Sequence, residues 1–182
     1  MTAPEGFTYI ADFLTPEEQA ALLRQVRALE FVHDRFRGVR LKRGYAQFGW
    51  AYVSNGRILK PAPPLPEYLI ALADKARRHL PDGSDPFDQC IVTEYPEGAG
   101  IGWHTDAPRF GDCIIAVSLA AQAILQFRRN GTEPVGCEVV AAPGSLYVMC
   151  GPARWDWQHQ VAPVASVRYS LTFRHVGQPA RR

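Results

Sequence analysis

The sequence has no long apolar run, and its first residues lack the profile of a secretory leader, so we expect no membrane role. No stretch approaches the roughly 18 consecutive apolar residues that a membrane span needs. The N-terminal residues MTAPEGFTYI lack the charged and then apolar profile of a signal peptide. We therefore expect a soluble, cytoplasmic protein that does not bind a membrane.

Cysteine is scarce and scattered. The chain has four cysteines and no Cys-x-x-Cys pair; they are Cys90, Cys113, Cys137 and Cys150. Each lies in an apolar, strand-like context, and this pattern indicates neither a disulfide framework nor a cysteine-based zinc site. We expect all four to be reduced residues of the core.

Repeats, low-complexity tracts and a second-domain boundary are also missing. The 182 residues, of which 47% are hydrophobic and 21% charged, are enough for one domain with a proper core and too few for two. We therefore expect residues 1–182 to form a single domain, and the protein to be a monomer.

The net charge is only +2, but the charges are unevenly distributed. Residues 24–43 contain seven basic side chains against two acidic ones, whereas residues 82–112 contain seven acidic side chains and one basic, Arg109. The basic stretch can face phosphates, and part of the acidic stretch surrounds a candidate cation site. Because the whole chain is nearly neutral, two ordinary solvated surfaces fit the same pattern.

The pattern of the first 80 residues predicts two helices. Thr15-Pro16-Glu17-Glu18 has the form of a capping box, and apolar residues follow it at helical spacing. A second helix is predicted over residues 66–79, with an inner side made of Leu69, Ile70, Leu72, Ala73 and Ala76. Residues 40–66 between the helices favour strands or a β-hairpin followed by a rigid, proline-rich connector.

The remainder of the chain is predicted to be all β. Short runs of β-branched or aromatic residues, bounded by turn residues, occupy 90–95, 113–119, 123–128, 137–140, 145–149, 159–161 and 167–175. Runs of this length and spacing are typical of a sandwich or barrel of antiparallel strands. The fold class is therefore α+β, mainly β, with N-terminal helices packed on the β core.

A His-x-Asp pair is the first candidate for chemistry. His104 and Asp106 project from the same face of an extended segment, and His159 begins another β run 55 residues later. Two histidines and one carboxylate on one face of a metal, with the other face open to co-substrate and O₂, are typical of non-haem Fe(II) oxygenases. Considered alone, His-x-Asp occurs by chance in many proteins, and His159 fits a core or loop position equally well.

The strand 168–174 supplies a second element. Polar Arg168, Ser170, Thr172 and Arg174 alternate with apolar residues, so one face carries two guanidinium groups. If the apolar face meets the core, these groups point into the barrel, where a buried arginine requires an anion. A small dicarboxylate that chelates the metal and pairs with a guanidinium satisfies both needs. The alternative is a pair of surface arginines on an edge strand.

Together, residues 95–106 (YPEGAGIGWHTD), His159 and residues 168–174 (RYSLTFR) resemble the AlkB family of Fe(II)- and 2-oxoglutarate-dependent dioxygenases. The resemblance extends over about residues 40–176. It implies a double-stranded β-helix, or jelly roll, over about residues 88–176 and a nucleotide-recognition lid over about residues 38–62.

The resemblance also implies roles for individual residues. His104, Asp106 and His159 would bind iron and carry the catalysis. Arg168 would pair with the distal carboxylate of 2-oxoglutarate, and Tyr95 would donate its hydroxyl to that co-substrate. Arg174 would lie near the chelating end of the co-substrate and close to the target base, and it too is assigned to catalysis.

Three positions depart from the family pattern. Thr93 and Ser170 stand where the bacterial prototype has asparagines that contact the co-substrate. Both keep a hydrogen-bonding group, so we expect binding to persist with altered affinity. Pro108 stands where members that repair nucleobases often carry an acidic residue that reads the base, and proline offers no side-chain hydrogen bond.

Substrate contacts are predicted in the lid. Phe48, Trp50 and Tyr52 offer rings on which a flipped base can stack, and the basic stretch before them can hold phosphates. The same alternation of aromatic residues is also what a half-buried strand would show.

The function that the resemblance implies is oxidative removal of alkyl groups from bases in DNA or RNA, as in DNA repair or RNA demethylation. The lesions would be 1-methyladenine, 3-methylcytosine or etheno adducts, and the cofactors Fe(II) and 2-oxoglutarate. The chain lacks an HExxH motif, which argues against a hydrolytic zinc enzyme. The alternatives are a 2-oxoglutarate-dependent hydroxylase of RNA, protein or a small molecule, and a nucleic-acid-binding module without catalysis.

Overall fold

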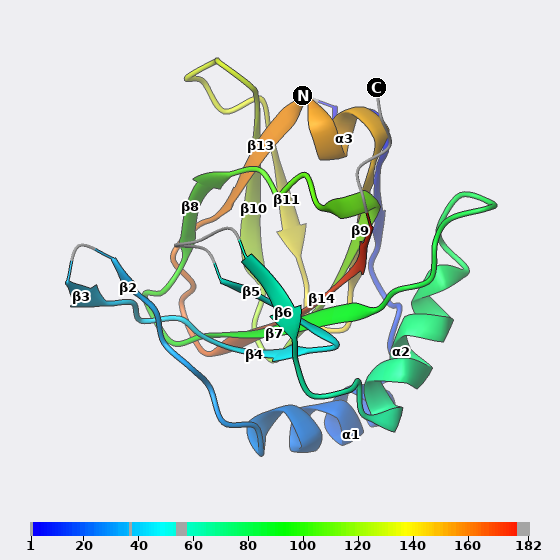
Figure 1. The fold of residues 1–182 in the computed structure, drawn as a ribbon. Coiled ribbons are helices and arrows are strands. Elements are labelled where there is room, and N and C mark those ends of the chain that lie inside the picture. The colour runs from blue at the N-terminus through cyan, green and yellow to red at the C-terminus, as the bar shows by residue number, and fades with distance from the viewer. Residues whose placement is uncertain (1, 37, 54–57, 178–182) are drawn as a thin grey trace.

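We describe the fold from a computed structural model, which covers residues 2–36, 38–53 and 58–177 (Figure 1). Helices α1 (Pro16–Arg27) and α2 (Glu67–Arg77) lie against one face of the larger of two main sheets, and the short α3 (Gly151–Trp155) follows a strand of that sheet. In this part of the chain no helix is long and apolar enough to cross a membrane.

Two antiparallel sheets face each other. The larger has the strand order β1 (Phe7–Ile10), β12 (Leu146–Cys150), β9 (Phe110–Leu119), β14 (Arg168–Val176), β7 (Gln89–Tyr95), β4 (Gly44–Phe48). The smaller has the order β11 (Cys137–Ala141), β10 (Ala123–Arg129), β13 (Trp157–Val161), β8 (Ile101–His104). Strands distant in sequence pair in both sheets, and the predicted jelly-roll class is confirmed.

The helices follow their sequence signals closely. At α1 the Thr15 side chain accepts from the Glu18 amide, and the Glu18 carboxylate accepts from the Thr15 amide, which completes the predicted capping box. Helix α2 ends at Arg77, two residues before the predicted end. Its buried stripe is Leu69, Leu72, Ala73 and Ala76.

For one residue of α2, Ile70, the prediction that it lies on the inner side is wrong. Ile70 is 48% exposed. Each residue turns about 100° around a helix, so the residue that follows Leu69 points away from the stripe that Leu69 defines.

Two layers of apolar side chains hold the elements together. One layer joins α1 and α2 to the larger sheet and includes Val26, Leu69, Val92, Leu171 and Phe173. The other fills the space between the two sheets and includes residues such as Tyr95, Ile114, Leu125, Phe127 and Tyr147. Odd-numbered residues of β14 face the helices, so its even-numbered residues face the barrel interior, as the alternation predicted.

The cysteine prediction is only half right. Cys90 and Cys137 are free and buried, but Cys113 and Cys150 form a disulfide. The register of β9 on β12 sets Cys113 directly opposite Cys150. The two residues are 37 positions apart in sequence, so the pairing depends on strand register, which their spacing alone does not reveal.

Strands occupy much of the described part of residues 40–66, as the glycines and aromatics indicated. Strand β3 (Val39–Arg40) closes a hairpin with β2 (Arg35–Phe36), and β5 (Trp50–Val53) pairs with β6 (Ile58–Pro61). Gly49 separates β4 from β5 at a φ of +75°, and a Cβ there would lie 1.9 Å from the Asp88 carbonyl oxygen. Only glycine permits this turn. Residues 37 and 54–57 of the predicted basic stretch and lid lie outside the described residues.

Candidate active site

Three side chains converge between the sheets. Strands β8 and β13 pair so that His104 lies opposite His159, with their ring centroids 4.3 Å apart. Asp106 follows two residues after the end of β8, and its Oδ2 lies 3.7 Å from His159 Nε2. One potential ligand atom from each of the three residues lies within 4.8 Å of the others. This donor set fits a single divalent metal ion with an open face.

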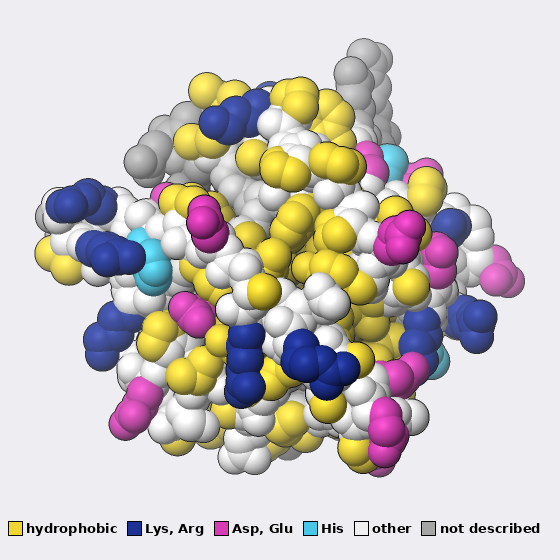
Figure 2. All heavy atoms as spheres, turned by 90° about the horizontal axis from the view of Figure 1, so that it is seen from below, with side chains coloured by type: hydrophobic (Ala, Val, Ile, Leu, Met, Phe, Trp, Pro, Cys, Tyr) yellow, Lys and Arg dark blue, Asp and Glu magenta, His cyan; other side chains and the backbone are white. Residues whose placement is uncertain are grey.

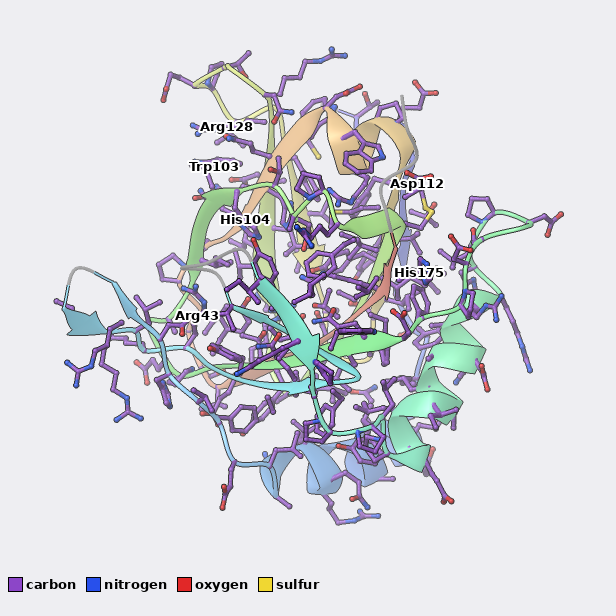
Figure 3. All side chains as sticks on the ribbon, viewed as in Figure 1. Arg43, Trp103, His104, Asp112, Arg128 and His175 are labelled. Atoms are coloured by element: carbon purple, nitrogen blue, oxygen red, sulfur yellow. A yellow bond between two sulfur atoms is a disulfide. The ribbon has the colours of Figure 1, made fainter. Side chains whose placement is uncertain are left out.

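Successive side chains of β8 point to opposite sides of the sheet, so His104 and its neighbour Trp103 have different surroundings. His104 points into the barrel, whereas Trp103 lies on the outer side beside Arg128, whose guanidinium carbon is 4.5 Å from the Trp103 ring centroid (Figure 3). His104 Nδ1 lies 2.8 Å from the Gly102 carbonyl oxygen. A proton on Nδ1 satisfies that carbonyl and leaves Nε2 free for a metal.

The charge states of the Asp106 carboxyl and the His159 imidazole suit a bound cation. Burial raises the pKa of the Asp106 carboxyl, but the Arg174 guanidinium and smaller contributions from His159, His104 and Arg154 outweigh burial and hold that pKa below its usual range. Arg174 Nη2 and Nε donate to Asp106 Oδ1 at 2.6 and 3.0 Å, so Oδ2 is the oxygen that faces His159. Burial, followed by the charge of His104, lowers the pKa of His159 to about 3. A carboxylate and a neutral imidazole are the forms that bind metals.

Arg168 places a buried positive charge on the larger sheet. Its side chain is fully buried, and Nη2 donates to Ser118 Oγ at 2.8 Å. The guanidinium carbon lies 5.2 Å from the Tyr95 ring centroid. Within the described residues, Nε and Nη1 have no hydrogen-bond partner. Two unpaired nitrogens of a buried guanidinium are costly, and a carboxylate satisfies both.

A pocket of about 430 Å³ extends from the three candidate metal ligands to the segment around β4 and β5. Eight predicted site residues line it: His104, Asp106, His159, Tyr95, Thr93, Ser170, Arg174 and Tyr52. Phe48, Trp50, Pro108 and Arg168 are not in its wall. Phe48 packs into the helix-side layer instead, and Pro108 is exposed on the turn before β9.

Comparison with known proteins identifies the chain. Residues 6–174 match the 2OG-Fe(II) oxygenase superfamily. The protein belongs to this superfamily. It is an AlkB-like dioxygenase that depends on Fe(II) and 2-oxoglutarate, as three observations indicate: the AlkB-type sequence motif, the group of three candidate metal ligands and the relatives described next.

The relatives differ in how much of their length this dioxygenase covers. It is 29% identical to Uncharacterized protein L905 of Acanthamoeba polyphaga mimivirus, over 94% of this chain and 85% of that protein. It is 28% identical to mouse tRNA (carboxymethyluridine(34)-5-O)-methyltransferase ALKBH8, over 88% of this chain and only 24% of that protein. It is 27% identical to zebrafish Probable RNA/DNA demethylase ALKBH6, over 70% of this chain and 52% of that protein.

Solved structures share the fold at low sequence identity. OsALKBH1 superposes with a TM-score of 0.77 at 19% identity and covers 96% of this chain and 98% of its own. A Pseudomonas putida prolyl-4-hydroxylase gives a TM-score of 0.66 at 18% identity and covers 94% and 92%. The jelly-roll arrangement is therefore common to oxygenases that differ widely in sequence.

Arg154 supports the dioxygenase centre and was not predicted from the sequence. Arg154 of α3 is 3% exposed and donates to four backbone carbonyls. They belong to Asp106, Ala107, Phe110 and Gly111, at 3.2, 2.8, 3.2 and 3.4 Å. The guanidinium thereby holds together the loop that carries the carboxylate ligand. No local pattern could have revealed it, because its partners lie more than 40 residues earlier in the chain.

Proposed function

We propose that this dioxygenase removes N-alkyl groups from the bases of DNA or RNA. The observation that carries the proposal is the composition of the pocket wall. The part of the pocket wall that comes from residues 34–52 contains polar and aromatic side chains: Asp34, Arg43, Tyr45, Gln47 and Tyr52. Such a wall suits a flat, hydrogen-bonding base more than an aliphatic side chain.

Positive charge beside the pocket supports a nucleic-acid substrate. Arg35 and Arg40 lie on the β2–β3 hairpin, and Lys42 and Arg43 follow it. Figure 2 shows Lys and Arg side chains gathered on the projection at the left edge, which is this hairpin in Figure 1. Cationic groups at a pocket mouth hold the phosphates that flank an extruded nucleotide.

Tyr52 is the aromatic residue that supports base stacking. Its ring lines the pocket and meets the Phe110 ring edge-on at 5.5 Å. The Gln47 side chain accepts from the Tyr52 amide at 2.7 Å and donates to the Tyr52 carbonyl at 3.3 Å, which ties β5 to β4. A ring held in this way can stack on a base at little entropic cost.

In this proposal 2-oxoglutarate would lie between the two sheets. Arg168 would bind the distal carboxylate of 2-oxoglutarate, Tyr95, Thr93 and Ser170 would donate hydrogen bonds, and Arg174 would remain paired with the ligand Asp106. Bound Fe(II) supplies the activation of O₂. One oxygen atom enters succinate as 2-oxoglutarate loses CO₂, and the other enters a C–H bond of the N-alkyl group. The C–N bond then breaks and releases an aldehyde and the unmodified base.

The names of the relatives agree with this substrate class. The zebrafish relative is named Probable RNA/DNA demethylase ALKBH6. A relative from Arabidopsis thaliana, 27% identical over half of its own length, is named an alkylated DNA repair protein homolog. The chain spans only about a quarter of mouse ALKBH8, so the methyltransferase activity in that name is not carried over.

The test is aerobic turnover with Fe(II) and 2-oxoglutarate. Succinate and formaldehyde should form together on oligonucleotides containing 1-methyladenine or 3-methylcytosine, in DNA and RNA versions, and not on unmodified oligonucleotides. His104→Ala and Asp106→Ala should abolish both products while thermal melting remains cooperative. Equal succinate with and without methylated bases, and no formaldehyde, would exclude nucleobase dealkylation. Undiminished turnover in either variant would refute the ligand assignment.

A further inference from the structure

The disulfide between Cys113 and Cys150 lies beside a second cavity. This cavity has a volume of about 310 Å³, and both cysteines line it. Both are half-buried, whereas the two free cysteines, Cys90 and Cys137, are buried. Of the four cysteines, the disulfide-bonded pair is therefore the more accessible to a small reductant.

The wall of this second cavity is mainly negative. Asp82, Asp85 and Asp112 line it, and among its described lining residues the only basic side chain is His175 (Figure 3). His175 Nε2 lies 3.9 Å from Asp85 Oδ2, so one of the three carboxylates has a partner of opposite charge when the imidazole is protonated. Because like charges repel, the wall favours an uncharged reductant over an anionic one.

The disulfide joins the two segments that position a candidate metal ligand. Cys150 is the N-cap residue of α3, the helix that carries Arg154. On the other side, Cys113 lies two residues after Gly111, the last of the four residues whose carbonyls Arg154 binds. The first of those four is Asp106. The disulfide and the Arg154 hydrogen bonds therefore connect the same helix to the same loop.

Reduction would leave this loop less firmly held. The Arg154 hydrogen bonds and the pairing of β9 with β12 would remain, but the covalent link would be lost. Loss of a cross-link lowers the free energy needed for local opening. Whenever the loop opens, Asp106 leaves the position in which it faces His159. The apparent Kd for a metal then rises, because only the closed fraction of the protein binds with full affinity.

We propose that Cys113–Cys150 is a redox-active site, which uncharged dithiols reduce from the second cavity and whose reduction lowers the affinity of the metal site. One thiolate of the dithiol attacks a cysteine sulfur, the protein S–S bond breaks and a mixed disulfide forms. The second thiolate of the reductant displaces the protein sulfur and closes a cyclic disulfide. Two electrons and two protons pass to the protein, which gains two thiols. This inference holds for any substrate and so goes beyond the proposed function.

The experiment compares Mn(II) binding by the oxidised and the reduced protein. Dihydrolipoamide, an uncharged dithiol, reduces the protein, and gel filtration without oxygen removes the reductant before isothermal titration calorimetry. Alkylation of the denatured protein and mass spectrometry should count two thiols before reduction and four after it. Reduction should raise the Kd for Mn(II) about three- to tenfold, less than the roughly 10- to 100-fold expected when a group that supports a metal ligand directly is lost.

Three variants test whether the disulfide acts through the loop. Cys113→Ser should have the Mn(II) affinity of the reduced wild type and no response to dihydrolipoamide. Cys137→Ser removes a free cysteine and should keep the full response. In Arg154→Gln, reduction should raise the Kd by a larger factor than in the wild type, because neither link then holds the loop. Thermal melting of each variant shows whether the fold is retained.

A second reductant tests the route to the disulfide. Dihydrolipoate has the same two thiols as dihydrolipoamide but carries a carboxylate, so the negative wall should make its reaction severalfold slower at low ionic strength. Added salt should reduce this difference. Asp112→Asn should also reduce it, whereas Asp74→Asn, the same change on the exposed face of α2, should not.

The outcomes separate this inference from the proposed function. An Mn(II) affinity that reduction does not change would overturn the coupling, even where melting shows a lower stability. A response that persists in Cys113→Ser, or an equal factor in Arg154→Gln and the wild type, would also overturn it. Equal reduction rates with the two dithiols would overturn the route through the second cavity. A lack of formaldehyde from methylated oligonucleotides would overturn only the proposed function.

Discussion

At the scale of single residues, the buried guanidinium of Arg168 needs a hydrogen-bond acceptor for its unpaired nitrogens. Its guanidinium is fully buried, with two nitrogens unpaired in the described residues. We predict that Arg168→Ala raises the KM for 2-oxoglutarate on the order of 10- to 100-fold, the contribution of a charge-assisted hydrogen bond. Arg168→Lys should recover part of this loss because lysine keeps the charge but not the planar fork. Steady-state kinetics measure both, with Arg24→Ala on the exposed face of α1 as the control; a KM unchanged in Arg168→Ala would contradict the assignment.

The residue scale also shows what the sequence can and cannot predict. The candidate metal ligands came from the family resemblance, because the spacing of His104 and Asp106 and the β run at His159 left a chance pair and a core histidine open; the structure brings the three together. Arg154 was missed because its partners come from distant segments, and a single arginine in sequence resembles any surface charge. Phe48 was assigned to the pocket on the pattern of aromatic residues, but Gly49 turns the chain directly after it and Phe48 faces the helices.

At the scale of elements, helix α3 positions the loop that carries the ligand. Arg154 binds four carbonyls of that loop. We predict that Arg154→Gln raises the dissociation constant for Mn(II), a redox-stable substitute for Fe(II), on the order of 10- to 100-fold, as loss of groups that support metal ligands does elsewhere. Arg154→Lys should recover part of the affinity. Isothermal titration calorimetry measures the dissociation constant of each variant. Lower thermal stability with unchanged Mn(II) affinity would show that Arg154 has a purely structural role.

The disulfide gives a second prediction at this scale. Cys113–Cys150 ties β9 to β12 immediately before α3 and closes a loop of 37 residues. We predict that reduction by a dithiol lowers the free energy of unfolding by about 2–4 kcal/mol, the usual range for a loop of this length. Denaturant unfolding with and without the reductant measures this. Cys113→Ser should abolish the sensitivity to reductant and Cys137→Ser should retain it; sensitivity that persists in Cys113→Ser would contradict the prediction.

The elements themselves were largely predictable. Each β run of residues 90–175 corresponds to a strand, because β-branched and aromatic residues bounded by turn residues fit a pleated, half-buried surface. The error at Ile70 arose because neighbouring apolar residues of a helix were counted as one face. The disulfide was missed for a different reason, since it depends on which strands pair and in which register.

At the scale of the whole molecule, the site joins the two sheets. His104 and His159 come from the smaller sheet, whereas Arg168 and Arg174 come from the larger one. A metal held by the two histidines and a dicarboxylate held by the arginines would therefore link the sheets, and both would bind only the folded state. Ligands at about 100 times their dissociation constant stabilise a protein by about 2.7 kcal/mol.

We therefore predict that Mn(II) and 2-oxoglutarate together raise the Tm by roughly 5–10 °C for a chain of this size. 2-Oxoglutarate alone should have a much smaller effect, because only Arg168 and its neighbours would then hold it. Calorimetry in the presence and absence of a chelator measures the shift. His159→Ala removes the ligand from the smaller sheet and should abolish most of the shift. An equal rise in that variant would show that the ligands bind elsewhere and that the two sheets do not share one metal site.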